Sequence, residues 1–366
     1  MLGGGQLGRM AAMAAARLGY RVHVLTPEAD SPAAGVSAAA TVAAYDDAEA
    51  LARLADSAPA VTLEFENVPV AALEALERRG VAARPGPRAL ATCQDRLLEK
   101  AFLESVGVPV PPWRPVRDRA GLDAAAREVG LPAVLKTTRL GYDGRGQAVL
   151  RAPGDLDAAW ERLSPRPLVL EALVPFAAEV SALAARGADG ATVTWDAAEN
   201  RHAGGVLDLT LAPARVPAAV AAMARAHAAR AAEALGLVGV LAVEFFLLTD
   251  GTLLGNEMAP RPHNSGHWTL DGCRFGQFES QVRAAAGLPL GDTARHSDAA
   301  MRNLVGAEGM ARVPGLLADP GLAVHLYGKS EARPGRKMGH ATRLLPRGAL
   351  AGAEGPEPLA ALLAGL

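Results

Sequence analysis

Apolar and polar positions alternate along the first ninety residues in short blocks that predict strands separated by helices. A cluster of glycines at 3–8 leads into an Ala-, Met- and Leu-rich helix that ends near residue 19. The pattern then predicts strands at 21–25 and 61–65 and helices at 47–54 and 70–79. Strands that alternate with helices form parallel β-α-β units, which bind ligands at the carboxyl ends of their strands. This segment is therefore predicted to be an α/β domain.

The pattern changes after residue 92 to that of an α+β body. A helix at 95–106, bracketed by prolines, leaves the first domain, and the tail after about Asp292 is Gly/Pro-rich and predicts only short elements. Further helices are predicted at 155–163 and 217–235; strands are predicted at 133–137, 147–151, 238–248 and 252–257 and, as parts of one antiparallel sheet, at 168–172, 179–186 and 191–195.

The composition narrows the class of protein. The chain has 366 residues, enough for two or three domains at roughly 150 residues each, and a net charge of -2, which argues against general nucleic-acid binding. No uncharged apolar run is long enough for a transmembrane helix, and the glycine-rich start does not resemble a signal peptide. Cys93 and Cys273 form no CxxC motif and are expected to be reduced thiols in a cytoplasmic protein.

Lysine and asparagine are scarce. Only four of the 37 basic residues are lysines, at positions 100, 136, 329 and 337, and asparagine occurs five times. A compositional bias explains the scarcity, but under such a bias the remaining residues are expected where arginine or alanine cannot serve. We therefore expect each of these four lysines to have a function, including Lys100, whose role the sequence leaves open.

A glycine motif opens the chain. Gly3-x-Gly5-x-x-Gly8 fits the dinucleotide-binding fingerprint, and Glu28 lies where a ribose-binding acid would follow. Only two residues precede Gly3, so the strand that should come before the motif is almost absent. The milder interpretation is a tight turn that presents backbone N–H groups at a helix N-terminus to any anion.

Two glutamates are predicted to face each other across a hairpin. A two-residue turn at Asp250-Gly251 pairs Thr249 with Thr252, and the same register places Glu244 directly opposite Glu257. Like charges in directly opposed positions are destabilising, and a divalent cation removes the conflict. Two carboxylates together with phosphate oxygens commonly hold Mg²⁺. The alternatives are that one glutamate points to solvent or that a three-residue loop shifts the register.

Three further segments indicate anion binding. Lys136 ends an apolar strand before the glycine-rich loop 141–147, which is typical of a phosphate grip but could also be a surface turn. The run 261–267 places four polar or ionisable side chains beside the predicted metal, which indicates an anion-binding or proton-transfer site. Lys329 and the run 333–337 form a basic cluster, either a phosphate clamp or a solvated turn.

These motifs together resemble the 5-(carboxyamino)imidazole ribonucleotide synthases, ATP-grasp ligases of purine biosynthesis. The resemblance rests on GGGQLGRM at 3–10, EFENVP at 64–69, GYDGRGQ at 141–147, NEMAPRPHNSGH at 256–267 and RPGRKMGH at 333–340. It covers nearly the whole chain and keeps the order of the motifs. The runs at 141–147 and 256–267 are the most specific of the five.

The resemblance implies a fold and a reaction. The fold would be an α/β N-terminal, Rossmann-like pre-ATP-grasp domain at 1–92, an α+β ATP-grasp domain of two subdomains at 93–290, and a small β-rich C-terminal domain at 291–366. The enzyme would use ATP and Mg²⁺ to carboxylate aminoimidazole ribonucleotide with bicarbonate, through carboxyphosphate. It would act in the cytoplasm as a homodimer, without nucleic-acid or membrane partners.

The resemblance also assigns roles to matching positions. Asp143 would be the general base for the substrate amine, and Arg261 and His263 would contact bicarbonate or carboxyphosphate. Glu244 and Glu257 would hold Mg²⁺. ATP would be bound by Arg96, Lys136, Gly141, Tyr142, Asp143, Gly144, Arg145, Gly146, Gln147, Glu171, Val174, Glu179, His202, Asn256 and Glu257. The ribonucleotide would be bound by Gln6, Leu7, Glu64 and Asn264, and its 5′-phosphate by Lys329, Arg336 and Lys337, of which Lys329 and Arg336 would also serve the reaction.

Three other functions remain open at the level of sequence. The formate-dependent glycinamide ribonucleotide transformylase is also an ATP-grasp enzyme, but it is expected to have His-Asp where this chain has His263-Asn264. An NAD-dependent oxidoreductase would be built on the first ninety residues. A non-catalytic nucleotide-binding protein would not need the glutamate pair and Lys136.

Overall fold

The N-terminal region is an α/β unit with short parallel strand pairs. In the computed structural model, which describes residues 1–141, 146–351 and 356–366, β1 pairs with β2 and β3 with β4, both in parallel. Leu2 forms parallel bridges to Leu25 and Leu63, so the first residues act as the strand that precedes the glycines. The elements are α1 (Gln6–Arg17), β1 (His23–Thr26), η1 (Ala34–Val36), β2 (Ala39–Val42), α2 (Ala48–Ser57), β3 (Ala60–Val61), α3 (Val70–Arg78) and β4 (Ala82–Ala83). The predicted α/β class of this region is confirmed.

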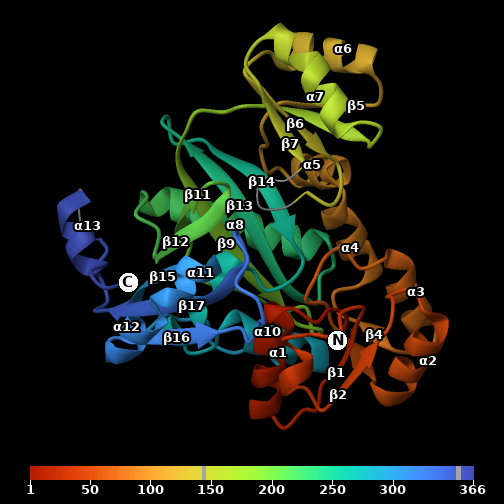
Figure 1. The fold of residues 1–366 in the computed structure, drawn as a ribbon, viewed down its shortest axis with the longest axis vertical. Coiled ribbons are helices and arrows are strands. Elements are labelled where there is room, and N and C mark those ends of the chain that lie inside the picture. The colour runs from red at the N-terminus through yellow and green to blue at the C-terminus, as the bar shows by residue number, and fades with distance from the viewer. Residues whose placement is uncertain (142–145, 352–355) are drawn as a thin grey trace.

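Two helices lead out of this region, and a small four-stranded sheet follows them. Its order is β5-β8-β6-β7, with every pair antiparallel, and it projects from the body of the molecule (Figure 1). The elements are α4 (Pro87–Gln94), α5 (Arg96–Ser105), β5 (Trp113–Val116), α6 (Arg119–Val129), β6 (Ala133–Thr137), β7 (Gln147–Leu150), η2 (Pro153–Asp155), α7 (Leu156–Leu163) and β8 (Leu168–Ala172). The prediction that 168–172 shares a sheet with 179–186 was wrong, because β8 pairs with β5 and β6 instead.

A nine-stranded sheet forms the body. Its order is β14-β13-β9-β11-β12-β15-β17-β16, with β10 paired to β9. The elements are β9 (Phe176–Arg186), β10 (Thr192–Thr194), β11 (Ala198–Ala203), β12 (Val206–Ala212), α8 (Ala218–Ala234), β13 (Gly239–Leu248), β14 (Leu253–Ala259), η3 (Asn264–Gly266), α9 (Thr269–Gly272), α10 (Gln277–Ala286), β15 (Asp298–Val305), α11 (Gly306–Ala311), α12 (Val313–Ala318), β16 (Leu322–Leu326), β17 (Lys337–Leu345) and α13 (Pro356–Leu362).

Small side chains let this sheet pack closely against α8. The helix contributes Ala224, Ala228, Ala231 and Ala232 to a core that also contains Val180 of β9 and Val243 of β13, all of them buried. Burial of this apolar area supplies the main favourable free energy of folding. Because alanine side chains are short, the alanine-rich helix α8 can lie close against the sheet.

The C-terminal tail differs from its prediction of short elements. β15 has eight residues and β17 has nine; the two pair with each other, and β15 also pairs with β12, so both extend the large sheet. The run 298–305 lacks a clean alternation of apolar and polar residues because both of its faces are buried. The prediction was wrong here because burial between neighbouring strands outweighs the local signal.

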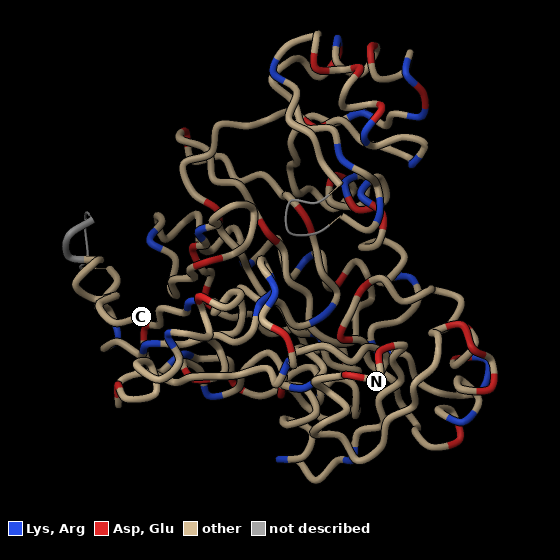
Figure 2. The backbone as a smooth tube through the Cα atoms, in the orientation of Figure 1, with Lys and Arg blue, Asp and Glu red and all other residues tan. Residues whose placement is uncertain are grey.

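The distribution of charge, the length of the apolar helices and the state of the cysteines agree with what the sequence predicts. Figure 2 shows acidic and basic residues interspersed along the chain rather than gathered by sign. Among the described residues, no helix is long and apolar enough to cross a membrane. Cys93 and Cys273 are both free thiols, as predicted.

Candidate functional site

Two cavities meet at a shared wall between the N-terminal region and the two sheets. The first, here called the N-terminal cavity, has a volume of about 310 Å³ and is lined by Gln6, Leu7, Glu64 and Arg261, among others. The second, the sheet cavity, has a volume of about 320 Å³ and is lined by Lys136, Gln147, Glu179, His202 and Asn256, among others. The residues that line both are Arg96, Glu244, Glu257, His263, Asn264 and Lys337.

The β13–β14 hairpin places Glu244 opposite Glu257, as predicted, but by a different register. The loop has three residues, with Gly251 at φ +87, so Leu247 pairs with Leu253 rather than with the next residue along. A bulge at Asn256 then restores the register, and Glu244 faces Glu257. The predicted pair is therefore confirmed, whereas the predicted two-residue turn was wrong.

Burial and mutual repulsion raise the pKa of one carboxyl of this pair. Burial is the largest cause at Glu244, and the nearby Glu257 adds to it, so the pKa of Glu244 is raised. Burial opposes ionisation of Glu257 too, but Arg96 and then Lys136 outweigh it and lower the pKa of that carboxyl. Both terminal nitrogens of Arg96 lie 3.1 Å from Oε2 of Glu257. A divalent cation between the two carboxylates would lower the cost of ionising Glu244.

Three charged side chains meet next to this wall, and one of them, Lys136, lines the sheet cavity. Nζ of Lys100 lies 3.0 Å and Nζ of Lys136 lies 2.9 Å from Oε2 of Glu171. Lys100 and the Glu171 side chain are almost completely buried. Lys100 also donates to the main-chain oxygen of Asn256 at 3.5 Å, at the bulge beside Glu257. Lys100 therefore joins α5, β8 and β14 and holds both Glu171 and the bulge in place.

The Lys100→Arg variant should lose activity although its charge is unchanged. The space around Lys100 is closed, and a planar guanidinium cannot reproduce the contacts of a compact ammonium with Glu171 and Asn256. We expect kcat with ATP to fall at least about tenfold, the equivalent of 1.4 kcal/mol. The control is the reverse exchange Arg53→Lys on an exposed part of α2. Equal activities in steady-state assays of the two variants would contradict a role for Lys100.

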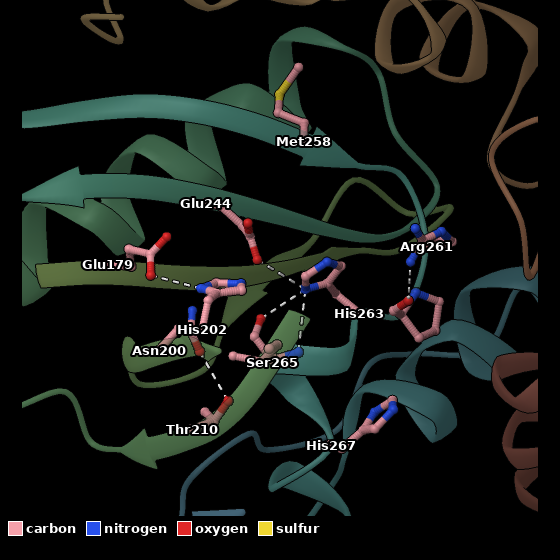
Figure 3. A network of polar contacts seen from close by, with 12 residues as sticks. Glu179, Asn200, His202, Thr210, Glu244, Met258, Arg261, His263, Ser265 and His267 are labelled. Carbon is pink, nitrogen blue, oxygen red and sulfur yellow. Dashed lines mark hydrogen bonds and ion pairs between the residues drawn. The ribbon is translucent and has the colours of Figure 1, made fainter. Parts of the chain in front are cut away.

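The sheet cavity combines aromatic and polar walls. Phe176 and Phe246 stack with ring centroids 4.8 Å apart. Nδ1 of His202 lies 2.7 Å from Oε2 of Glu179, and this contact raises the pKa of His202 against the effect of burial (Figure 3). The structure thus brings Glu179 and His202 together at one cavity. The two phenylalanines were missed at the level of sequence: Phe246 appears there as an ordinary strand residue, and Phe176 falls between two predicted strands.

Glu64 explains the glycine motif at the start of the chain. Its carboxylate accepts hydrogen bonds from the backbone N–H groups of Gly5 at 2.8 Å and Gly8 at 3.2 Å. A Cβ atom at Gly3 or Gly5 would lie within 3.0 Å of Glu64, so only glycine permits this approach. The anion at the helix N-terminus is thus a side chain of the protein. Gln6 and Leu7, which follow at the start of α1, line the N-terminal cavity with Glu64.

The segment after β14 carries a second group of polar side chains into the shared wall. Arg261 forms an ion pair with Glu66. Nδ1 of His263 lies 2.9 Å from Oγ of Ser265 and 3.7 Å from Oε1 of Glu244 (Figure 3). Burial, followed by the nearby Arg261, lowers the pKa of His263 to about 3, so its imidazole is neutral at pH 7. The side-chain amide of Asn264 is buried and has no hydrogen-bond partner at either atom. It is therefore available to a ligand.

The basic residues near the C-terminus gather beside this wall, but only one of them lines it. Lys337 lines both cavities, whereas Lys329 and Arg336 do not. Nζ of Lys329 donates to the main-chain oxygen of Lys337 at 2.7 Å. Burial and then Arg336 lower the pKa of Lys329 to about 8, while Glu64 acts in the opposite direction. The three cations therefore lie close to one another and to the N-terminal cavity.

Several predicted residues lie away from the two cavities or outside the described residues. Gly141 lines the N-terminal cavity, whereas Gly146, Glu171 and Val174 line neither of the two. Tyr142, Asp143, Gly144 and Arg145 lie outside the described residues. Glu99 was missed: it is buried and lines the N-terminal cavity, its carboxylate accepts the N–H of Met258, and burial raises its pKa to about 8.

Family models match three consecutive parts of the chain. The ribonucleotide synthetase preATP-grasp domain matches residues 1–94, the ATP-grasp domain residues 101–278, and the phosphoribosylaminoimidazole carboxylase C-terminal domain residues 299–351. The chain therefore has an α/β pre-ATP-grasp region, an α+β ATP-grasp region and a C-terminal β-rich region, as predicted.

Individual proteins give the same result. An N5-carboxyaminoimidazole ribonucleotide synthase of Brucella melitensis is 49% identical, over 95% of this chain and 96% of that protein. The crystal structure of the synthetase from Thermus thermophilus is 45% identical, with a TM-score of 0.88, and covers 100% of this chain and 98% of its own. A structure of the Aspergillus clavatus synthase with ADP and 5-aminoimidazole ribonucleotide is 31% identical, with a TM-score of 0.89, over 100% of this chain and 96% of its own.

Proposed function

Because the chain belongs to the N5-carboxyaminoimidazole ribonucleotide synthases, we propose that it uses ATP to carboxylate 5-aminoimidazole ribonucleotide with bicarbonate, in purine biosynthesis. The observation that best supports this reaction is that two cavities share one wall, which contains a glutamate pair, an arginine, a neutral histidine and an unpartnered amide. A ligase needs such an arrangement, since the phosphoryl donor and the acceptor must meet at one place.

We assign the nucleotide to the sheet cavity. Its stacked phenylalanines provide an apolar surface for a base, and Glu179 with His202 provides acceptors and donors for a ribose. Lys136 and Arg96 provide positive charge at the shared wall, where the phosphates would lie. Loop 141–147 follows the strand that carries Lys136. Glu171 would act through the two lysines that it holds, and Val174 and Asn256 complete the proposed set.

The residues present fit a magnesium ion. Glu244 and Glu257 are opposed in the sheet, and burial, followed by the nearby Glu257, raises the pKa of Glu244. Two carboxylates and phosphate oxygens suit the preference of Mg²⁺ for oxygen ligands. When bound, the ion would offset charge on the transferred phosphoryl group. Arg96, which now contacts Glu257, would become available to phosphate oxygens.

We assign the ribonucleotide to the N-terminal cavity. Gln6, Leu7, Glu64 and Asn264 would contact it, while Lys329, Arg336 and Lys337 would hold its 5′-phosphate. Arg261 and His263 line the same cavity as the glutamate pair, with His263 next to Glu244, and they would hold bicarbonate or carboxyphosphate. Asp143, outside the described residues, is proposed as the general base for the amine.

Three further proposals accompany this assignment. The domains are proposed at 1–92, 93–290 and 291–366. We propose a cytoplasmic location, which suits two free thiols. We also propose a homodimer, and the molar mass in solution, measured by light scattering, would test it.

Isotope transfer tests the proposed chemistry. An oxygen of bicarbonate attacks the γ-phosphorus, the bond from that phosphorus to the bridging oxygen breaks, and ADP leaves. After the carboxyl group passes to the amine, the attacking oxygen stays on phosphate. Bicarbonate labelled with ¹⁸O should therefore give phosphate with one ¹⁸O, detected by ³¹P NMR. Unlabelled phosphate from a working enzyme would contradict the route through carboxyphosphate.

The Lys329→Ala variant should bind the ribonucleotide more weakly. Loss of one phosphate contact from a compact charge is expected to raise KM for the ribonucleotide by about tenfold or more, the effect of a charged hydrogen bond of 1.5–3 kcal/mol. The KM for ATP should change little. Arg312→Ala, at an exposed position between α11 and α12, is the control for loss of a positive charge. A change confined to the KM for ATP would show that the phosphate-clamp assignment is wrong.

The pKa of Lys329 predicts that kcat/KM for the ribonucleotide depends on pH. Its pKa is lowered to about 8, chiefly by burial, so the side chain loses its charge as the pH rises through this value. The kcat/KM for the ribonucleotide, which reports on the free enzyme, should therefore fall above about pH 8. The Lys329→Arg variant keeps its charge and should not show this fall. Identical pH profiles for the two proteins would exclude Lys329 as the titrating group.

A further inference from the structure

Three side chains that can bind a metal meet away from both cavities. Asp271 lies in α9, His325 in β16 and His340 in β17, and one ligand atom of each lies within 4.8 Å of the others. Nε2 of His325 is 2.9 Å from Oδ2 of Asp271. His325 is directly opposite His340 in the strand pair, and their rings stack with centroids 4.6 Å apart. None of the three lines the N-terminal or the sheet cavity.

His340 has a buried nitrogen without a partner. Its side chain is fully buried, and its Nδ1 lies 2.8 Å from the hydroxyl of Tyr327, whereas its Nε2 has no hydrogen-bond partner. In a neutral His340 ring whose Nδ1–H donates a hydrogen bond to the Tyr327 oxygen, Nε2 is an acceptor with a lone pair that no donor satisfies. A buried acceptor in that state is costly unless a cation occupies it.

We propose that Asp271, His325 and His340 bind a zinc-type divalent transition-metal ion, with Tyr327 as the hydrogen-bond partner that orients His340. Two imidazoles and one carboxylate suit Zn²⁺, whereas Mg²⁺ prefers an all-oxygen set such as the glutamate pair. The hydrogen bond between a ligating histidine and a second residue is a regular feature of such sites. The side chains of His325 and Asp271 are 29% and 20% exposed, which leaves a path for the ion and room for water as a further ligand.

The ion would link two segments that reach the shared wall. α9 comes shortly after His263 and Asn264, and β17 begins at Lys337. The ring of Tyr327 also lies under Lys329, whose Nζ is 5.6 Å from the ring centroid. Binding would therefore stabilise the β16–β17 hairpin against α9. This metal site does not depend on the proposed reaction.

Zinc binding by the metal-stripped full chain tests the proposal. Zn²⁺ is titrated in competition with a chromogenic chelator, with excess Mg²⁺ present to occupy the glutamate pair. The wild-type protein should bind one equivalent. The His325→Gln and Asp271→Asn variants should bind at least about tenfold more weakly, and Tyr327→Phe roughly 10–100-fold more weakly. His296→Gln removes an exposed histidine elsewhere and should bind zinc like the wild type.

Two results would overturn the site. They are the absence of a zinc equivalent in the wild type, and unchanged zinc binding by both ligand variants, which would place the ion elsewhere. If a ligand variant fails to fold, histidine modification of the wild type decides the question. Zn²⁺ should protect His325 from diethyl pyrocarbonate, as measured by mass spectrometry, and modification at an unchanged rate would likewise overturn the site.

Discussion

Replacement of Glu257 by glutamine is expected to lower the rate of ADP formation by at least about 100-fold while the fold is retained. The variant loses one of the two opposed carboxylates proposed to hold Mg²⁺, and it loses the charged partner of Arg96 at 3.1 Å. A metal ion contributes several kcal/mol of charge stabilisation in such a reaction, and each 1.4 kcal/mol is a factor of ten in rate. The measurement is ADP release under saturating substrates, with circular dichroism as the check on folding.

A matched substitution separates the loss of a metal ligand from the loss of any carboxylate. Glu161→Gln makes the same chemical change at an exposed position of α7 and should leave the rate within about twofold. A folded Glu257→Gln enzyme with a rate close to that of Glu161→Gln would show that the metal assignment is wrong.

The Glu171→Gln variant should be the least stable of the variants considered. Its carboxylate is the common partner of Lys100 and Lys136, at 3.0 and 2.9 Å, and lies out of contact with solvent. Removal of one member of a buried ion cluster leaves uncompensated charge, which costs roughly 3–5 kcal/mol. Urea denaturation should show this loss relative to Glu161→Gln. A difference below about 1 kcal/mol would mean that the two lysines find other partners.

The cost of this substitution should depend on pH. Burial raises the pKa of Glu171, but Lys136, Lys100 and Arg96 outweigh this effect and lower the pKa from its ordinary value of 4.5 to about 2. A carboxyl whose pKa is lower in the folded than in the unfolded protein stabilises the fold at pH values above its pKa in the unfolded protein. This contribution is lost as the pH falls toward its pKa in the folded protein. The difference in unfolding free energy between wild type and Glu171→Gln should therefore narrow below pH 4.5.

The glutamate pair illustrates how far the sequence could lead. The spacing of Glu244 and Glu257 around Asp250-Gly251 was enough to predict that they face each other, and they do. The reason differs, because a three-residue loop shifts the register and the bulge at Asn256 shifts it back. A bulge depends on contacts with distant parts of the same chain, here the hydrogen bond from Lys100 of α5 to Asn256, and no local sequence pattern predicts it.

Other parts of the site depend on contacts between distant residues. Lys100 stood out because lysine is scarce, but its partner Glu171 lies on β8 and is brought to it only by folding. The glycine motif predicted an anion at a helix N-terminus, and the anion is Glu64 from a loop some sixty residues away. β15 and β17 were missed for a related reason, since their pairing and not their composition makes them strands. Residue type thus predicted the chemistry better than it predicted the partners.

ADP release measured with each substrate omitted in turn tests the central claim most directly, namely that one reaction takes place at the wall between the two cavities. ATP, Mg²⁺, bicarbonate and 5-aminoimidazole ribonucleotide are supplied together, and then without bicarbonate or without the ribonucleotide. The account predicts rapid ADP release only in the complete mixture, with a rate that falls at least about tenfold when either is left out. Undiminished ADP release without the ribonucleotide or without bicarbonate would contradict it.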